Sequence, residues 1–372
     1  MGAQRLLVAA SFTFMLGVGA AVSTLPITLR QISSNELEVS LAVTVWGLAY
    51  LVSNIPAGVL ADKLGAGRVA PLAFLSNVAV GLALFTSTSV AGFAAARAAE
   101  GVLEAMVWTS VLGLAAKSEG RLLGISGVFA AIALGFSLGP IAASQLALIS
   151  ARSPFLAYSL CALISFFLTL PLRSERQTRV EMLTIRAPSS LQILPPLIVS
   201  LTVGITESLI IVYSPVIAEM AGVGDSRLIV SGYYLLGLLG QVAIRLNPRA
   251  VTREYYVPAS FLLAALALAF TPLKFTALGV LLLGFVNAQA ASRSQAKVAE
   301  LMQGVESTGA GLANLAWALG YFAGSPLYSS ALAASLDPLG GTALFLTASL
   351  ALQITLGFTA RSRASRARTS LG

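Results

Sequence analysis

Histidine is absent from this 372-residue chain, and cysteine occurs once, at Cys161. A single cysteine excludes an intramolecular disulfide and a cysteine-built metal centre. The lack of histidine also excludes the usual zinc motifs and Ser-His-Asp catalytic arrangements. We therefore expect no metal site, no cofactor and no enzyme active site, and any side chain that carries protons must be a carboxylate.

Charge is also scarce: only 10% of the residues are charged, against roughly 25% in soluble domains. The chain is 57% hydrophobic and its mean hydropathy is +0.86. Apolar stretches of about 20 residues recur along it, and each is long enough to cross roughly 30 Å of hydrocarbon. The sequence therefore predicts an all-α membrane protein embedded in a lipid bilayer, without a soluble domain.

The hydropathy pattern predicts twelve transmembrane helices. We expect the first to be retained, because no small-residue cleavage site and soluble region follow it. The expected spans are 6–29, 39–61, 69–87, 90–115, 124–148, 153–172, 191–217, 227–246, 255–272, 275–298, 306–331 and 341–360.

Lysine and arginine are placed asymmetrically around these spans. If both termini are cytoplasmic, almost all basic loop residues lie inside, as the positive-inside rule requires. The net charge of +8 is then explained by basic loops that lie beside anionic lipid headgroups, and it does not call for a nucleic-acid partner. We expect a multi-pass protein of the plasma membrane. The opposite face keeps only Arg30, Arg152, Arg227 and Lys274.

The chain contains an internal repeat. The pattern Ala-Leu-Gly-aromatic-x-x-Gly occurs at Gly135 and Gly139 and again at Gly320 and Gly324. The simplest explanation is two six-helix halves, a duplication found in secondary transporters whose substrate sites lie between the halves near the midplane. The predicted organisation is an N-terminal bundle at 1–172, a cytoplasmic linker at 173–189, a C-terminal bundle at 190–360 and a basic cytoplasmic tail at 361–372.

Three charged residues share one stripe of the fourth span. Spacings of three and four residues align Arg97, Glu100 and Glu104 on one helical face, together with Trp108. Each charge at bilayer depth costs roughly 2.5–3.5 kcal/mol on insertion scales. The stripe therefore indicates a water-filled path or a buried charge network.

Three interpretations of this stripe remain open. In the first, Arg97 and Glu100 form a structural pair while Glu104 bonds a neighbouring helix. In the second, Glu104 lacks a permanent cation and loads and releases protons. In the third, the carboxylates bind a cationic or polar substrate. The last two are compatible, because competition between a proton and a substrate for one carboxylate is itself a coupling mechanism.

Further polar residues lie at comparable depth in the second half. Glu207, in the seventh span, is a second protonation site, a substrate ligand or a hydrogen-bonded structural residue. Asn287 and Gln289, in the tenth span, are expected to line the substrate path, because an unpaired amide in hydrocarbon is costly. The aromatic candidates for apolar walls of that path are Trp108, Tyr213 and Trp317.

The loop after the second span carries a motif built from Gly58, Asp62, Lys63, Gly65 and Arg68. Gly58 allows helices to approach closely, Gly65 permits a tight turn, and Asp62 can bond helix ends and basic side chains. This loop resembles the signature G-x-x-x-D-(R/K)-x-G-(R/K)-(R/K) of the major facilitator superfamily. The resemblance implies a latch that favours the outward-facing state.

Departures from that signature weaken the expected latch. Ala66 and Gly67 replace two residues that are usually basic in the family. In the second half, Asn247 stands where the repeat places the counterpart of Asp62, so we expect the gating charge to be asymmetric.

Two further segments resemble motifs of the same family. Arg97-x-x-Glu100-Gly101 is similar to R-x-x-Q-G, whose arginine is implicated in proton transfer, and Glu100 replaces the usual glutamine. Gly135-x-x-x-Gly139-Pro140 is similar to the motif typical of antiporters. Glycines four apart favour close helix packing, and Pro140 predicts a kink.

These observations predict a monomeric transporter with the major facilitator fold that works by alternating access. We expect proton-coupled efflux of small amphipathic or organic compounds, driven by a proton gradient. The alternatives are uptake or facilitated transport of a sugar or organic acid, and a membrane sensor or scaffold that transports nothing.

Overall fold

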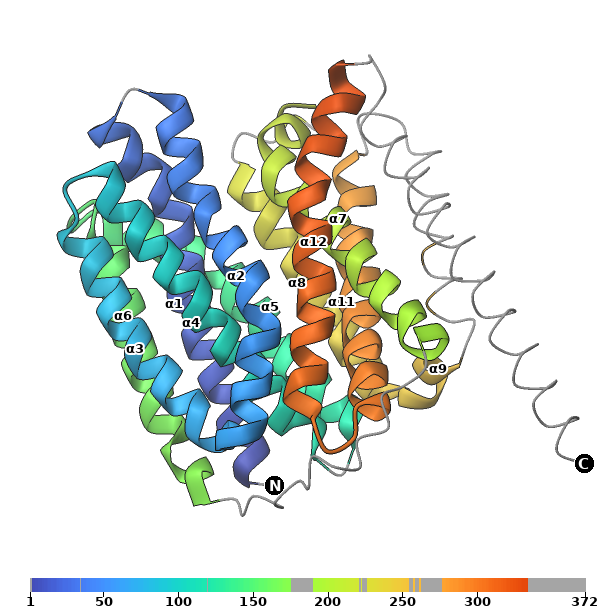
Figure 1. Cartoon of the computed structure of the whole chain (residues 1–372). Coiled ribbons are helices and arrows are strands. Elements are labelled where there is room, and N and C mark those ends of the chain that lie inside the picture. Colours follow the sequence, from blue (N-terminus) through green and yellow to red (C-terminus); the bar gives the residue numbers. More distant parts are fainter. Residues whose placement is uncertain are drawn as a thin grey trace, which may run out of the picture.

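The computed structural model describes residues 2–33, 35–118, 120–174, 190–220, 222, 226–253, 257, 261 and 276–333 (Figure 1). Every regular element within these residues is a helix, and ten of the helices are long. The elements are α1 (Gly2–Ile32), α2 (Glu36–Leu64), α3 (Ala66–Thr86), α4 (Val90–Ala116), α5 (Arg121–Ala147), α6 (Ser153–Thr169), η1 (Leu170–Ser174), α7 (Ser190–Met220), α8 (Ser226–Leu246), α9 (Pro248–Thr252), α11 (Thr276–Leu301) and α12 (Glu306–Ala333).

The ten long helices coincide with ten of the twelve expected spans, and each contains most of the span predicted for it. α5 continues through Pro140. The ninth span, at 255–272, falls almost entirely outside the described residues, and the twelfth, at 341–360, lies wholly outside them. So do most of the linker at 173–189 and the tail at 361–372.

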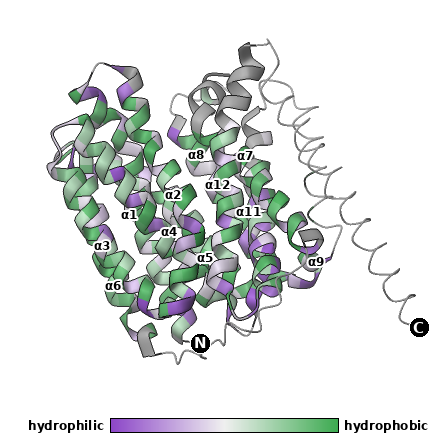
Figure 2. Ribbon diagram, viewed as in Figure 1, coloured by the Kyte–Doolittle hydropathy of each residue, from purple (hydrophilic) through white to green (hydrophobic). Residues whose placement is uncertain are grey.

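The helices present an apolar surface suited to lipid. Seven of those described are long and apolar enough to cross a membrane, including α1, α3, α4, α5 and most of α2. Large apolar side chains are left exposed along them, for example Val52, Leu160 and Phe167 at 63%, 58% and 59%. Figure 2 shows hydrophobic residues along most of α3 and α6, while hydrophilic residues gather toward the end of the molecule where the N-terminus lies. Such a surface is a liability in water and is expected in a bilayer.

Two hydrophobic cores lie side by side. One is built from α1–α6, with a few residues from α11 and α12, and the other mainly from α7, α8 and α11. In the first half α2 packs on α4, and α1 packs on α5 and α6; in the second, α7 packs on α12 and α8 on α11. Phe136 and Trp317 pack against both cores.

The repeated glycines occupy equivalent contacts in the two halves. A Cβ atom on Gly135 or Gly139 of α5 would collide with the backbone of α1, at Leu16 or Gly19. A Cβ on Gly320 of α12 would collide with the backbone of α7 in the same way. Each pair of helices therefore approaches closely because the glycines lack side chains.

The halves meet mainly along two helix pairs, α2 with α12 and α5 with α8, and α12 also contacts α4 while α11 contacts α5. In the order of the predicted spans, the main pairs are span two with span eleven and span five with span eight. Span two corresponds to span eight in the repeat, and span five corresponds to span eleven. Interchanging the halves therefore converts one pair into the other. The hydroxyls of Ser137 and Ser231 each donate to the other residue's carbonyl oxygen across α5 and α8, at 3.1 and 3.2 Å. In Figure 1, α2 and α12 converge toward the end where the N-terminus lies.

The contact between α2 and α4 provides a test of this packing. A Cβ on Gly101 would meet the Trp46 carbonyl oxygen and would lie 2.9 Å from the Tyr50 nitrogen, whereas a Cβ on Gly47 would meet nothing within 4 Å. Gly101→Ala should lower the free energy of unfolding by about 1–3 kcal/mol, the usual cost of overpacking. Gly47→Ala, the matched control, should be neutral or stabilising by up to about 1 kcal/mol. Thermal unfolding in detergent measures both, and equal effects would contradict the close contact.

Candidate functional site

The charged stripe of α4 is buried in the first half. Arg97, Glu100 and Glu104 are 4%, 0% and 3% exposed. Arg97 Nη1 donates to Glu100 Oε2 at 2.5 Å, so these two groups neutralise each other. The guanidinium carbon of Arg97 also lies 5.5 Å from the ring centroid of Trp46 on α2, a favourable cation–π distance.

Glu104 is held differently. Its Oε2 accepts a hydrogen bond from the indole Nε1 of Trp46 at 3.2 Å, and its Oε1 has no hydrogen-bond partner among the described residues. No lysine or arginine in the described part of the chain forms an ion pair with Glu104. With Arg97 and Glu100 paired, the stripe carries one net negative charge when every group is ionised, and that charge resides on Glu104.

The second half repeats this arrangement. Glu207 of α7 accepts a hydrogen bond from the Tyr234 hydroxyl of α8 at 2.5 Å and one from the Trp317 indole of α12 at 2.8 Å. Within the described ranges no cation pairs with Glu207 either. Each half thus holds one membrane-embedded carboxylate through neutral aromatic donors instead of a counter-charge.

Only part of the expected substrate path gathers around Glu207. Asn287 lies close by and donates to the Thr206 hydroxyl at 2.6 Å and the Tyr233 hydroxyl at 2.9 Å. Gln289 instead donates to the Gly240 carbonyl of α8 at 3.3 Å, where it joins two helices.

The three expected wall aromatics separate in the structure. Trp317 contacts Glu207 directly, at the junction of the two halves. Trp108 packs against Phe14 inside the first core, with ring centroids 5.9 Å apart. The side chain of Tyr213 lies outside the described part of the structure.

Three site residues escaped the sequence analysis: Trp46, Tyr50 and Tyr234. Trp46 and Tyr50 are four residues apart and therefore share a helical face. Nothing in their spacing tells which helix that face meets, so only the packing of α2 against α4 and α12 identifies them. The adjacent residues Tyr233 and Tyr234 in the eighth span are visible in the sequence, but two neighbouring tyrosines do not by themselves indicate a functional site.

The loop motif joins the two halves at the end where α2 finishes. Asp62 accepts hydrogen bonds from the backbone nitrogens of Ser307 and Thr308 at 3.1 and 2.7 Å, and from the Thr308 hydroxyl at 2.7 Å. These donors form the first turn of α12, where the helix dipole favours negative charge. A Cβ on Gly58 would collide with Ser307 and Thr308, so the glycine permits the contact.

The remaining motif residues serve the turn. Gly65 has φ of 95°, a conformation that favours glycine, and is the N-cap residue directly before α3. Lys63 and Arg68 are exposed. In the second half, the side chain of Asn247 accepts a hydrogen bond from the backbone nitrogen of Ala250 at 3.2 Å and so caps α9. This local bond keeps the side chain from bonding the other half as Asp62 does.

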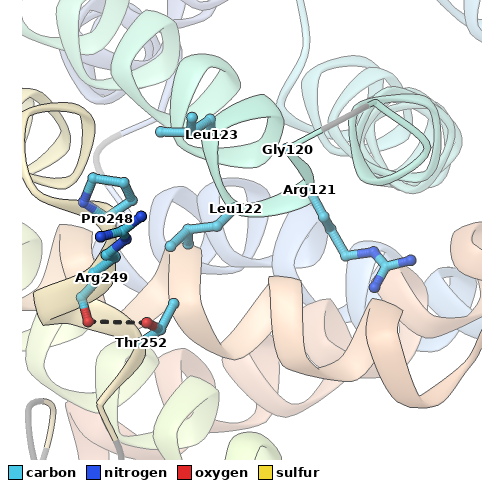
Figure 3. Close-up of a pocket in the computed structure, with 7 residues that line it drawn as sticks. All are labelled: Gly120, Arg121, Leu122, Leu123, Pro248, Arg249 and Thr252. Atoms are coloured by element: carbon cyan, nitrogen blue, oxygen red, sulfur yellow. Dashed lines mark hydrogen bonds between the residues drawn. The ribbon is translucent and has the colours of Figure 1, made fainter.

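A separate cavity of about 290 Å³ lies where α5 and α9 begin, and Figure 3 shows its lining. Two arginines, Arg121 and Arg249, flank an apolar floor that includes Leu122 and Pro248. These residues lie at helix ends, away from the carboxylates at mid-helix.

Most of the chain matches a known protein family, and parts of it match individual relatives. A family model described as Major Facilitator Superfamily matches residues 7–325. The chain is 35% identical over 142 residues to an uncharacterized MFS-type transporter of Methanocaldococcus jannaschii, which is 37% of this chain and 36% of that protein. It is 28% identical over 173 residues to the quinolone resistance protein NorA of Staphylococcus aureus, which is 43% of this chain and 42% of NorA. The matches thus span about two fifths of these relatives.

Solved structures resemble the chain over almost its full length. The human organic anion transporter MFSD10 (TETRAN) has a TM-score of 0.78 at 17% identity, covering 95% of this chain and 98% of that one. The E. coli fucose:proton symporter FucP (N162A) has a TM-score of 0.76 at 12% identity, with the same coverage. These likenesses show the fold, an all-α arrangement of the kind found in these transporters, as the sequence predicts; ten of the twelve expected helices lie within the described residues.

The Asp62 contact generates a prediction about conformation. Asp62→Ala removes three hydrogen bonds from a charged acceptor, each worth about 1.5–3 kcal/mol, so α2 and α12 should separate more often. Spin labels at Leu64 and Gln303, in a Cys161→Ser background, report this as a distance distribution shifted to longer values. Asn247→Ala, at the corresponding position of the other half, should leave the distribution unchanged. An identical distribution in Asp62→Ala would contradict a latching role.

Proposed function

The chain belongs to the Major Facilitator Superfamily, and from this membership we propose that it is a secondary active transporter that exports a small amphipathic organic compound in exchange for protons. Transporters of this family bind small-molecule substrates within a membrane. We further propose that both termini face the cytoplasm, that the membrane is the plasma membrane and that the monomer is the working unit.

The observation that carries the proposal is the contrast between Glu100 and Glu104. Glu100 is paired with Arg97 at 2.5 Å, so protonating it would leave a buried arginine without a partner. Glu104 bonds only the Trp46 indole among the described residues, so it can accept a proton without stranding a cation. Loss of water favours the neutral form of such a carboxylate, whereas access to water favours the charged form. Alternating exposure to the two sides would therefore load and unload a proton.

Glu207 has the properties of a partner site for this cycle. It lies in the other half and accepts hydrogen bonds from Tyr234 and Trp317. The neighbouring Tyr233 accepts a hydrogen bond from Asn287. Aromatic faces and a carboxylate together suit an amphipathic compound that carries polar or cationic groups. We propose that substrate occupies this side of the junction, and that protonation of Glu104 and substrate binding exclude one another across the cycle.

Asp62 gives the cycle its two states. With Asp62 on the first turn of α12, the two halves are closed at the end where the N-terminus lies. We propose that this is the cytoplasmic end, which makes the described arrangement outward-facing. Breaking the contact would open the opposite access route by moving one half against the other.

Export, and not uptake, is proposed for two reasons. The relative NorA is named a quinolone resistance protein, and Gly135-x-x-x-Gly139-Pro140 is similar to an antiporter motif. The fold alone does not select a direction, since the neighbour FucP is named a symporter.

Dye accumulation in efflux-deficient cells tests the proposal. Wild-type protein should lower the accumulation of at least one dye in a panel of cationic and neutral fluorescent compounds, and a protonophore should abolish the effect. Glu104→Gln, which mimics a permanently protonated side chain, should raise accumulation to the level of cells that lack the protein.

Glu300→Gln is the matched control. Glu300 is an exposed carboxylate that pairs with Lys297 at 2.9 Å, so its loss should leave export intact. A wild type that changes no dye would overturn the efflux proposal and make uptake of sugars and organic acids the next assay. Export that survives Glu104→Gln would remove Glu104 from the coupling role.

A further inference from the structure

Three aromatic rings connect the two carboxylate sites across the junction of the halves. Trp46 and Tyr50, one turn apart on α2, are stacked with ring centroids 5.2 Å apart and an interplanar angle of 17°. Tyr50 meets Trp317 of α12 edge to face, at 6.0 Å and 85°. Since the Trp46 indole bonds Glu104 and the Trp317 indole bonds Glu207, contacts run without interruption from one carboxylate to the other.

The backbones that carry the two indoles are fixed to the helices that carry the acids. A Cβ on Gly101 of α4 would collide with the Trp46 carbonyl oxygen, and a Cβ on Gly204 of α7 would collide with the Trp317 carbonyl oxygen. Trp46 is therefore packed tightly against the helix that carries Glu104, and Trp317 against the helix that carries Glu207. The Tyr50–Trp317 contact is the step that crosses from α2 in one half to α12 in the other.

We propose that Tyr50 is a positioning residue that couples the ionisation of Glu104 in one half to that of Glu207 in the other through the Trp46–Tyr50–Trp317 contacts. This inference rests on the proposed function, because it describes how the two proton or substrate sites of that transporter communicate. Tyr50 touches neither carboxylate by any hydrogen bond described and acts through the two indoles.

The physical basis is the change in each indole–carboxylate hydrogen bond on ionisation. An N–H group bonds an ionised carboxylate roughly twice as strongly as a neutral acceptor, so each indole is held more tightly when its carboxylate is charged. Protein interiors are packed densely enough that a displaced ring moves its neighbours. Tyr50 is 5% exposed and lies between the indoles, so a change at Trp46 reaches Trp317 through it. Two sites are coupled when they share a contact that has two arrangements and when each site favours one arrangement over the other.

The surrounding groups leave the carboxylates as the species that titrate. Glu104 interacts with Arg97 and Glu100 of its own helix, and Tyr158 of α6 and Tyr50 of α2 face it as well. The groups facing Glu207 are Tyr233 and Tyr234 of α8, Tyr321 of α12 and Tyr50. Tyrosine side chains change charge only at about pH 10 and above. Below that range, a change near either indole reports a glutamate.

The chain suits a direct measurement because it has three tryptophans, Trp46, Trp108 and Trp317. Purified full-length protein labelled with 5-fluorotryptophan gives one fluorine signal from each, assigned by single Trp→Phe variants. A pH titration then follows Glu104 through Trp46 and Glu207 through Trp317.

The proposal predicts that Glu104→Gln shifts the Trp317 midpoint by about one pH unit, the size of shift expected for strongly interacting sites. The shift is expected because the variant removes the ionised carboxylate that holds the Trp46 indole, and the change in that hydrogen bond reaches Trp317 through Tyr50. In a Tyr50→Leu background the same change should move the midpoint by less than about 0.2 unit. Tyr50→Phe keeps the ring and should preserve the full shift, which separates loss of the contact from misfolding.

Two results would overturn the proposal: a Trp317 midpoint that ignores Glu104→Gln, and a shift that persists undiminished in Tyr50→Leu. The second would mean that the charges interact directly, without the rings. The measurement needs no substrate and no gradient, so its outcome is independent of the dye assay. Coupling without export would leave this inference standing while the proposed function fails, and export without coupling would do the reverse.

Discussion

The lack of water among membrane-embedded helices governs how this protein treats every ionisable side chain. A carboxylate there must be neutralised by a cation, stabilised by donors, or protonated. Glu100 follows the first course with Arg97, whereas Glu104 and Glu207 follow the second with indole and phenol donors. The third course stays open only to the latter two. The same physical constraint that makes buried charge expensive thus selects which carboxylates can exchange protons.

Close packing complements this electrostatic pattern. Glycines allow α4 to pack closely on α2, α5 on α1 and α12 on α7 within the halves, and Gly58 and Gly311 allow the same close approach of α2 and α12 between the halves. Polar and aromatic contacts between the halves include Ser137 with Ser231, Tyr50 with Trp317, and Asp62 with the start of α12. Alternating access requires that contacts of this kind break and re-form as one half moves against the other. The aromatic contact lies at mid-helix and the Asp62 contact at one end, so a single movement alters both.

Several features could be predicted from particular residues. Ten spans were placed because hydrophobic length is set by bilayer thickness, and the repeated glycines predicted equivalent contacts in the two halves. Spacing put Arg97, Glu100 and Glu104 on one stripe, although it could not say which glutamate pairs with the arginine. The suggestion that Asp62 bonds a helix end followed from its motif, but its partners, Ser307 and Thr308, are some 245 residues away along the chain and carry no local mark.

The sequence by itself determined the membrane environment, the helical class, the duplication and the identity of the ionisable residues at bilayer depth, because these depend on composition, length and period. Only the tertiary structure decided the partners. It separated Gln289, which joins α11 to α8, from Asn287, which lies beside the Glu207 cluster, and it brought Trp46 and Tyr50 into the site. The physical reason is that a helix of known period still has an undetermined rotation and neighbours, and these are set by packing contacts between segments far apart in the chain.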